Sequence, residues 1–177
     1  MATTSEAPVS AGTATHTTIR SSLGDLTAVA RGETVTGLYF PHHWHLPDRS
    51  AFGEYQDAGF DEVRRQLGEY LAGERREFDL ALGAAGSPFQ ERVWRLLGQV
   101  PYAATVSYGE LARELGGGAT AQEVGHAVGR NPLSIIVPCH RVVGASGGLT
   151  GYAGGLRRKR ILLDLEQDVA GRSARLF

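Results

Sequence analysis

The sequence predicts an α+β fold in two parts. Residues 17–40 alternate apolar and polar side chains in short runs, a pattern typical of antiparallel strands. A helical stripe follows at residues 60–72, and beyond residue 85 short apolar stripes at helical spacing are separated by glycines. We therefore expect an N-terminal antiparallel β-meander with a helix, followed by a mainly helical C-terminal domain with a helix-turn-helix (winged-helix-like) arrangement.

The first domain is expected over residues 17–85, after a leader at residues 1–16. The leader is rich in Ala, Thr and Ser but lacks the basic start and apolar core of a signal peptide, so we expect it to be disordered. Turn residues at 22–25 and at Gly32-Glu33 separate the runs that follow. The expected strands are residues 17–20, 26–30 and 35–40.

One helix and one further strand complete the N-terminal domain. The helix at residues 60–72 has an apolar stripe formed by Phe60, Val63, Leu67 and Leu71. Residues 78–82 alternate like a fourth strand. The small residues at 83–87 mark the domain boundary, so that the C-terminal domain covers residues 86–177.

Three histidines, His42, His43 and His45, follow the third strand closely. Several imidazoles can bind a metal ion, but no cysteine or carboxylate stands at ligand spacing beside these three. We therefore expect a solvated loop here and no metal site.

The C-terminal domain carries signals for a helix-turn-helix. Ser107 with Glu110 three residues later is a capping box, and the helix that it starts ends at the glycines 116–118. A second short helix runs from about Thr120 to Val128 and stops at residues 129–132. Two short helices around a glycine turn are the pattern of this motif.

Two further helices flank this pair. Ser87-Pro88 opens a helix, since proline suits a first helical position, and its inward residues would be Phe89, Val93, Trp94 and Leu97. The last helix is expected at residues 156–167, with Glu166 near its end. Its inward residues would be Ile161, Leu162 and Leu165.

Composition limits the class of protein. No apolar run approaches the ~20 residues that cross a bilayer, which excludes a membrane span. The single cysteine cannot form an intramolecular disulfide, and a free thiol fits a reducing, cytoplasmic environment. Up to residue 85 the chain has 12 acidic and 7 basic residues, whereas from residue 86 it has 7 acidic and 11 basic ones. The mildly basic second half is compatible with a nucleic-acid partner.

The single cysteine, Cys139, lies in an apolar run between Pro138 and His140. An unperturbed thiol has a pKa of about 8.5 and is mostly protonated at neutral pH, so a neighbouring imidazole is the usual means of activating it. The alternative is a small buried apolar residue beside a chance histidine. The motifs around Cys139 favour a reactive thiol.

The most specific of these motifs is Val-Pro-Cys-His-Arg-Val-Val at residues 137–143. The others are Val-Ser-Tyr-Gly-Glu-Leu-Ala at 106–112, Gly-Arg-Asn-Pro at 129–132, and Gly-Tyr-Ala-Gly-Gly-Leu at 151–156 with Glu166 downstream. Together they resemble the O6-alkylguanine-DNA alkyltransferases, also called methylated-DNA–protein-cysteine methyltransferases. Related alkyltransferase-like proteins lack the acceptor cysteine, which this chain has.

The resemblance implies a DNA-repair reaction. Cys139 would take the alkyl group from O6 of a flipped-out guanine, or from O4 of thymine, in double-stranded DNA. His140 would take the thiol proton through a water, and Glu166 would orient the imidazole. Taken alone, without the resemblance, Glu166 is better explained as a surface charge at a helix end. Because a thioether is not hydrolysed under mild conditions, each molecule would act once, as a monomer without metal or cofactor.

The resemblance also assigns the residues around the base. Tyr108 would donate a proton or a hydrogen bond to the guanine ring, although a half-buried helix aromatic is an equal reading. Asn131 would brace the turn between the second helix and the cysteine loop, and Arg141 would be structural. The substrate contacts would be the carbonyls of Cys139 and Val142, the amide of Ala153, and the side chains of Tyr152 and Lys159.

The chain departs from the family pattern in the helix that would enter the minor groove. Family members usually carry an arginine there that fills the space left by the flipped base, and here Gln122 stands at that position. Glu123 replaces a small residue, and an acid is repelled by DNA phosphates. Atypical DNA binding is therefore expected. The residues expected to face DNA are Thr120, Ala121, Gln122, Glu123, Gly125 and Arg130.

Two other functions remain open. The same alkyl-acceptor chemistry would serve a free base, a nucleoside or another small alkyl donor without duplex DNA. A DNA-binding module without catalysis is the third function, and the intact Pro-Cys-His motif with Glu166 argues against it.

Overall fold

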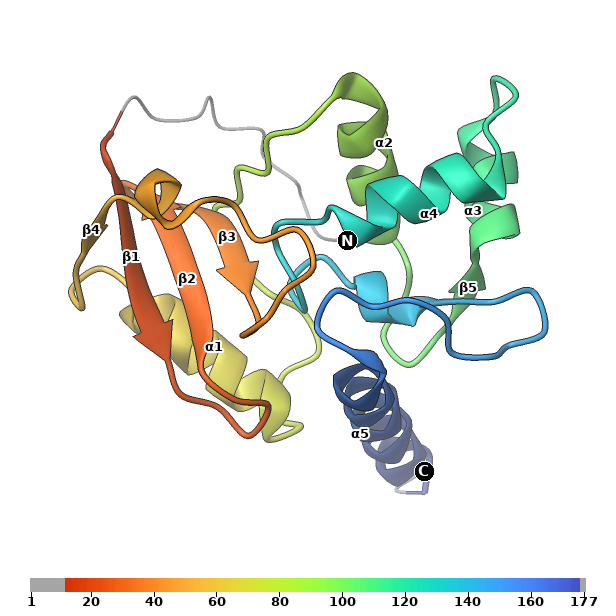
Figure 1. The fold of residues 1–177 in the computed structure, drawn as a ribbon. Helices are drawn as coiled ribbons and strands as arrows, with labels where there is room; N and C mark the ends of the chain where they lie inside the picture. Colours follow the sequence, from red (N-terminus) through yellow and green to blue (C-terminus); the bar gives the residue numbers. More distant parts are fainter. Residues whose placement is uncertain (1–11, 176–177) are drawn as a thin grey trace. The chain divides into compact units, whose positions relative to one another are not determined.

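The computed structural model describes residues 12–175, and the chain divides into two compact units (Figure 1). Of the described residues, the first unit contains 12–85 together with Pro132–Ile136. The second unit contains Gly86–Asn131 and residues 137–175. The division near residue 85 falls in the small-residue linker, whereas the sequence gives no sign that a short segment returns to the first unit.

The first unit is built on a four-stranded sheet in the order β3-β2-β1-β4. β1 (Ala14–Ile19), β2 (Leu26–Arg31) and β3 (Thr34–Tyr39) form the predicted antiparallel meander. The short strand β4 (Glu54–Tyr55) pairs in parallel with β1. The β-meander that the alternating pattern predicts is therefore confirmed.

β1 begins inside the stretch that the sequence assigns to a disordered leader. Ala14 pairs with Arg31 of β2 and is buried, so the prediction is wrong for residues 14–16. Backbone pairing with β2 holds these small and polar residues, and their composition alone does not reveal such pairing. Residues 1–11, the rest of the predicted leader, lie outside the described part of the chain.

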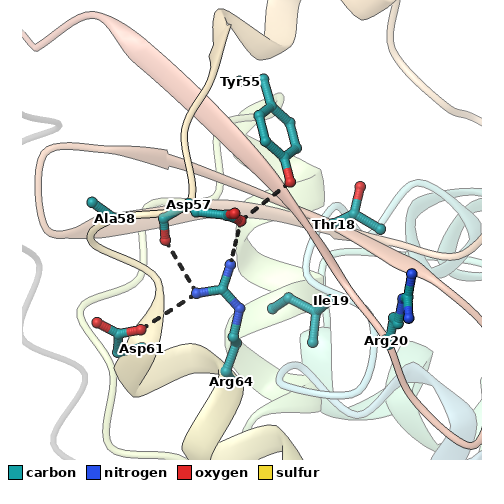
Figure 2. A pocket seen from close by; sticks show the side chains of 8 residues that line it. All are labelled: Thr18, Ile19, Arg20, Tyr55, Asp57, Ala58, Asp61 and Arg64. Atoms are coloured by element: carbon teal, nitrogen blue, oxygen red, sulfur yellow. Dashed lines mark hydrogen bonds and ion pairs between the residues drawn. The ribbon is translucent and has the colours of Figure 1, made fainter.

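α1 (Asp61–Leu71) is the predicted helix and lies behind the sheet in Figure 1. Arg64 Nη2 donates to Thr17 Oγ1 at 3.0 Å, which ties the helix to β1. The same arginine lines an open pocket with Asp57 and Tyr55 (Figure 2). Arg64 and Asp57 pair with each other at 2.9 Å, and none of the expected site residues lines this pocket.

Residues 78–82 do not form the predicted fourth strand. Within this segment only Leu82 forms a β-bridge, an isolated one to Val35 near the start of β3. The Gln66 side chain accepts from the Asp79 amide and donates to the Asp79 carbonyl, both at 2.8 Å. Because a helix side chain already satisfies these backbone groups, they do not need a neighbouring strand.

The histidines after β3 are not all solvated, contrary to expectation. His42 and His45 are exposed, but His43 is buried, with its ring edge-on to Tyr39 and 5.4 Å between ring centroids. Burial, and then the neighbouring His45, lowers the pKa of His43 to about 4. The loop leads into the 3-10 helix η1 (Arg49–Phe52). Within residues 12–175, no group of three or more His, Cys, Asp or Glu side chains is placed to hold a metal ion.

The segment Pro132–Ile136 is held in the first unit by β3. Leu38 donates to the carbonyl of Pro132 at 2.8 Å and accepts from the amide of Ser134 at 3.2 Å. Ile135 has φ 71, and the amide that follows it donates to the Ser134 carbonyl at 2.9 Å. This is a γ-turn with a positive φ at its central residue, a strained conformation that is rare for a β-branched side chain.

The second unit is mainly helical, as predicted. Its longer helices are α2 (Pro88–Leu97), α3 (Tyr108–Leu115), α4 (Ala121–Gly129) and α5 (Leu156–Ala174). α3 and α4 pack together as the expected helix-turn-helix (Figure 1). The two-residue strands β5 (Val106–Ser107) and β6 (Val142–Val143) pair in parallel. No helix in the described part of the chain is long and apolar enough to cross a bilayer.

α5 continues to Ala174, beyond the predicted end at Gln167. Leu162 is buried as predicted, but Ile161 is 41% exposed. Glu166 therefore lies well inside the helix and is fully buried, not at a surface-exposed end. Apolar periodicity misplaces Ile161 because two charged residues lie on the buried stripe, which consists of Lys159, Leu162, Leu163, Glu166 and Val169.

Candidate active site

A tight turn presents Cys139. Pro138, with φ −81 and ψ 64, is the centre of an inverse γ-turn in which the Cys139 amide donates to the Val137 carbonyl at 2.8 Å. The proline ring itself restricts φ to this range. Cys139 then opens the 3-10 helix η2 (Cys139–Arg141) and is only 4% exposed. The thiol is thus buried on a turn with little conformational freedom.

The residue after the C-cap of α4 braces this turn. Asn131 Nδ2 donates to the Val137 carbonyl at 2.9 Å, and both residues are buried. The Asn131 side chain also hydrogen-bonds Cys139, which lowers the pKa of the thiol. Asn131 therefore lies between the second helix of the helix-turn-helix and the cysteine loop.

His140 and Glu166 meet in the interior of the second unit. His140 Nε2 lies 2.7 Å from Glu166 Oε1, and both side chains are fully buried. Arg141 contacts the same carboxylate, with Nη2 3.0 Å from Oε1 and Nε 3.0 Å from Oε2. The Ala103 amide donates to Oε2 at 2.9 Å. Glu166 is thus a fully buried anion with three separate donor groups.

These contacts decide the ionisation of the pair. Burial alone raises the pKa of Glu166, but the hydrogen bonds and charges of His140 and Arg141 outweigh it and lower that pKa to about 2. Burial lowers the pKa of His140, against the opposing effect of Glu166. An ionised carboxylate only accepts hydrogen bonds, so a neutral imidazole here carries its proton on Nε2 and has Nδ1 as its basic atom.

Burial raises the pKa of Cys139, so the resting thiol is protonated. The Asn131 hydrogen bond and the Lys159 charge act in the opposite direction. Lys159 Nζ is fixed by the carbonyls of Thr150 and Gly151, at 2.7 and 3.1 Å. Its own pKa falls to about 8, mainly through burial. The Asn131 side chain and the Lys159 cation therefore both favour the thiolate over the thiol.

Tyr108 is the first residue of α3 and donates from its hydroxyl to the Thr150 carbonyl at 3.2 Å. A Cβ atom built on Gly125 of α4 would lie 3.7 Å from the Tyr108 ring, so the ring packs over this glycine. Burial raises the pKa of Tyr108, which keeps the hydroxyl protonated and able to donate. Tyr108 and Lys159 thus share the Thr150 carbonyl.

The remaining expected substrate contacts lie near Cys139 in the chain. Val142, Tyr152 and Ala153 are all buried. The Val142 amide donates to the Cys139 carbonyl and closes η2. A carbonyl oxygen has two lone pairs, so that of Cys139 keeps one for a further donor.

The residues expected to face DNA lie along α4, from its N-cap to its C-cap. Thr120, Ala121, Gln122 and Glu123 form its exposed N-terminal turn, Arg130 is the exposed C-cap, and Gly125 is half-buried. Thr120 and Glu123 form a capping box that the sequence reasoning overlooks. The Thr-x-x-Glu spacing at residues 120–123 is the missed signal, the same one that identifies the box of α3.

Arg141 is the other functional contact that sequence reasoning misses. From the sequence, Arg141 is expected to be structural, but no partner is predicted for it. In the structure its partner is the buried carboxylate of Glu166. Arg141 Nη1 also donates to the Val100 carbonyl at 2.6 Å. That His140 and Arg141 are neighbours in the sequence does not indicate that both side chains contact the same carboxylate.

Both parts of the chain match models of one family. Residues 15–84 match "6-O-methylguanine DNA methyltransferase, ribonuclease-like domain", and residues 88–168 match "6-O-methylguanine DNA methyltransferase, DNA binding domain".

Similar proteins bear the corresponding name. A methylated-DNA–protein-cysteine methyltransferase of Mycolicibacterium paratuberculosis is 47% identical over 162 residues, which is 92% of this chain and 98% of that protein. The enzyme of the same name from Mycobacterium tuberculosis is 46% identical over 170 residues, with the same coverage of both chains. The crystal structure of Mycobacterium tuberculosis OGT in complex with DNA has a TM-score of 0.84 and 45% identity, covering 88% of this chain and 94% of that one. On the buried Cys139, the His140–Glu166 pair and these similarities, the chain belongs to the methylated-DNA–protein-cysteine methyltransferases, the O6-alkylguanine-DNA alkyltransferase family.

Proposed function

We propose that this protein repairs alkylated DNA by moving an alkyl group from O6 of guanine, or from O4 of thymine, to Cys139. The observation that carries the proposal is the buried contact of 2.7 Å between His140 Nε2 and Glu166 Oε1 next to a protonated, buried thiol. Glu166 fixes the tautomer of His140, so that Nδ1 is the atom available to accept a proton.

The reaction then balances as a direct displacement. His140 Nδ1 takes the Cys139 proton through a water, and the sulfur attacks the alkyl carbon. The bond between that carbon and O6 breaks, and its electron pair stays on the guanine. The Tyr108 hydroxyl, kept protonated by its raised pKa, donates to the ring as this charge develops. The guanine anion then takes up a proton on its ring while His140 releases the thiol proton to water, so the products are an unmodified guanine and a thioether on Cys139.

The thioether makes the transfer irreversible. No group in this mechanism removes an alkyl carbon from sulfur, so each molecule acts once. The alkylated base itself supplies the reactive carbon, and the mechanism requires neither a metal nor a cofactor.

Duplex DNA is the proposed partner. A similar protein of Mycobacterium tuberculosis has been crystallised with DNA, and α4 offers an exposed turn formed by residues 120–123. Extrusion of a base costs a few kcal/mol, which contacts of the flipped base in the pocket must offset. Those contacts would come from the buried Val142, Tyr152 and Ala153 and from Lys159.

A second candidate is the same chemistry on a free base or another small alkyl donor. It is favoured by one observation, the acidic Glu123 beside the uncharged Gln122 on the surface that would meet DNA. The deciding experiment compares alkyl transfer from free O6-benzylguanine with transfer from a methylated duplex. Transfer from the free base alone would replace the repair function by the second candidate.

A further inference from the structure

We infer that Glu123 is a positioning residue for duplex DNA, which orders the first turn of α4 while placing a negative charge on that turn. The inference rests on the proposed repair function, in which this turn meets DNA. The Glu123 side chain thus has two effects, ordering of the turn and repulsion of DNA phosphates, and a different variant and measurement test each effect.

The capping box of α4 fixes Glu123 in place. Thr120 donates to Glu123 Oε2 twice, from its amide at 2.9 Å and from its hydroxyl at 2.7 Å. The Glu123 amide donates back to Thr120 Oγ1 at 3.2 Å. The two residues thereby satisfy helix donors that would otherwise need water.

Gln122 depends on this order. Its side chain is exposed and makes no hydrogen bond to any residue from 12 to 175. The direction in which Gln122 leaves the helix is therefore set by the backbone of the first turn, and the Thr120–Glu123 box sets that backbone. Loss of the box frees the residue that would enter the duplex.

The same carboxylate remains charged. Hydrogen bonds from the Thr120 side chain and backbone lower the pKa of Glu123, so it is an anion at neutral pH. An exposed anion on the surface that meets DNA opposes the phosphates, and salt screens this repulsion. Glu123 therefore orders the turn at the expense of affinity.

The chain contains a natural example of the same box without the charge. In α2 the N-cap is Ser87 and the third helical residue is Gln90, which accepts from the Ser87 amide at 2.9 Å. The Gln90 amide donates back to Ser87 Oγ at 3.3 Å. Glu123→Gln is therefore expected to keep the box of α4 and remove only its charge, whereas Glu123→Ala removes both.

The experiment uses the full chain with both variants and Asp164→Asn, a matched loss of an exposed charge on α5. Duplex affinity is measured against salt concentration, and single-turnover alkylation is measured at saturating methylated duplex and with free O6-benzylguanine. Circular dichroism confirms folding of each variant.

We expect Glu123→Gln to bind duplex roughly fivefold more tightly at low salt and to keep the wild-type rate at saturation. Glu123→Ala should lose severalfold in that saturating rate, while Asp164→Asn matches the wild type. All chains should react equally with the free base.

Equal saturating rates for Glu123→Gln and Glu123→Ala would overturn the positioning role. Wild-type affinity in Glu123→Gln would overturn the charge effect. Failure of the proposed function looks different, since wild-type protein would then take the alkyl group from the free base and leave the methylated duplex unchanged, whatever residue stands at position 123.

Discussion

The guanidinium of Arg141 and the carboxylate of Glu166 form a buried bidentate ion pair. Nη2 and Nε of Arg141 each lie 3.0 Å from a different carboxylate oxygen, and the two side chains are 8% and 0% exposed. Glu166 also accepts from His140, so the cation and the imidazole share one acid. The orientation of the proposed base therefore depends on Arg141, which itself need not touch the substrate.

Breaking this pair should be costly. We expect Arg141→Met to lower the free energy of unfolding by about 3 kcal/mol or more, because it leaves the Glu166 anion buried without its main partner. Urea unfolding measures the change. Arg65→Met, which removes the exposed partner of Glu62, is the control and should alter stability little. A similar small effect at both positions would contradict the role given to Arg141.

The stoichiometry of alkylation tests the acceptor. With excess methylated substrate, wild-type protein should gain the mass of one alkyl group, on Cys139, and then stop. Cys139→Ser should gain none and keep its fold, since the change is nearly isosteric. Intact-mass and peptide mass spectrometry measure both results, and sustained turnover would rule out the single-use mechanism.

The pH dependence of the rate tests the proton path. Burial holds the pKa of His140 below its ordinary value of 6.5, so the base stays neutral at pH 7 and the rate should fall only at more acidic pH. Glu166 raises the pKa of His140, and Glu166→Gln should therefore move this fall to still lower pH. The same variant should also react more slowly, by at most the factor of about 10²–10⁴ that a positioned base contributes.

Single-turnover rates from pH 5 to 9 measure this effect, and His140→Ala is the reference without the base. If Glu166→Gln reproduced the wild-type curve in both rate and position, Glu166 would have no part in proton transfer.

Substitutions at Ala103 test the hydrogen bond from its backbone amide to Glu166. Its φ of 62 lies in the left-handed region, and its amide donates to Glu166 Oε2. Ala103→Gly should leave activity intact and stabilise the fold by at most about 1 kcal/mol, because glycine relieves the strain but is freer in the unfolded chain. Ala103→Pro cannot adopt this φ and lacks the amide hydrogen, so it should destabilise by about 3 kcal/mol or more. Thermal and urea unfolding compare the two, and equal stability of both variants would show that this amide contributes nothing.

The substitution Gln122→Arg tests whether the first turn of α4 contacts DNA. We expect Gln122→Arg combined with Glu123→Gln to bind duplex more tightly than wild type, with a salt slope steeper by about one to two. The glutamine at 123 keeps the capping box, which an alanine would remove. The rate on methylated duplex should rise while that on free O6-benzylguanine stays level. Unchanged affinity would mean that this turn does not meet DNA.

Local signals in the sequence predict much of this fold. Serine followed by proline or by a glutamate three residues later marks the starts of α2 and α3, and the alternating runs mark the meander. The Pro-Cys-His-Arg motif points to the reactive thiol through its resemblance to the motif of the family. The capping signals depend on contacts within a few positions of the chain.

Features that depend on distant contacts were less accessible. Glu166 has the pattern of a helix-end surface charge, and only the fold reveals that Arg141 and Ala103 surround it in the interior. Residues 78–82 alternate like a strand, but Gln66 of α1 takes the backbone groups of Asp79. In both cases a side chain far along the chain decides the outcome.

The return of Pro132–Ile136 to the first unit limits how this protein can be divided. A chain cut at Gly86 would keep Cys139 but would lose Leu38, whose backbone holds Pro132 and Ser134 just upstream of it. The backbone of β3 thus fixes, by hydrogen bonds, the segment that leads into the cysteine turn. Exchanging the N-terminal domain between relatives would therefore have to preserve the edge of β3 as well as the linker.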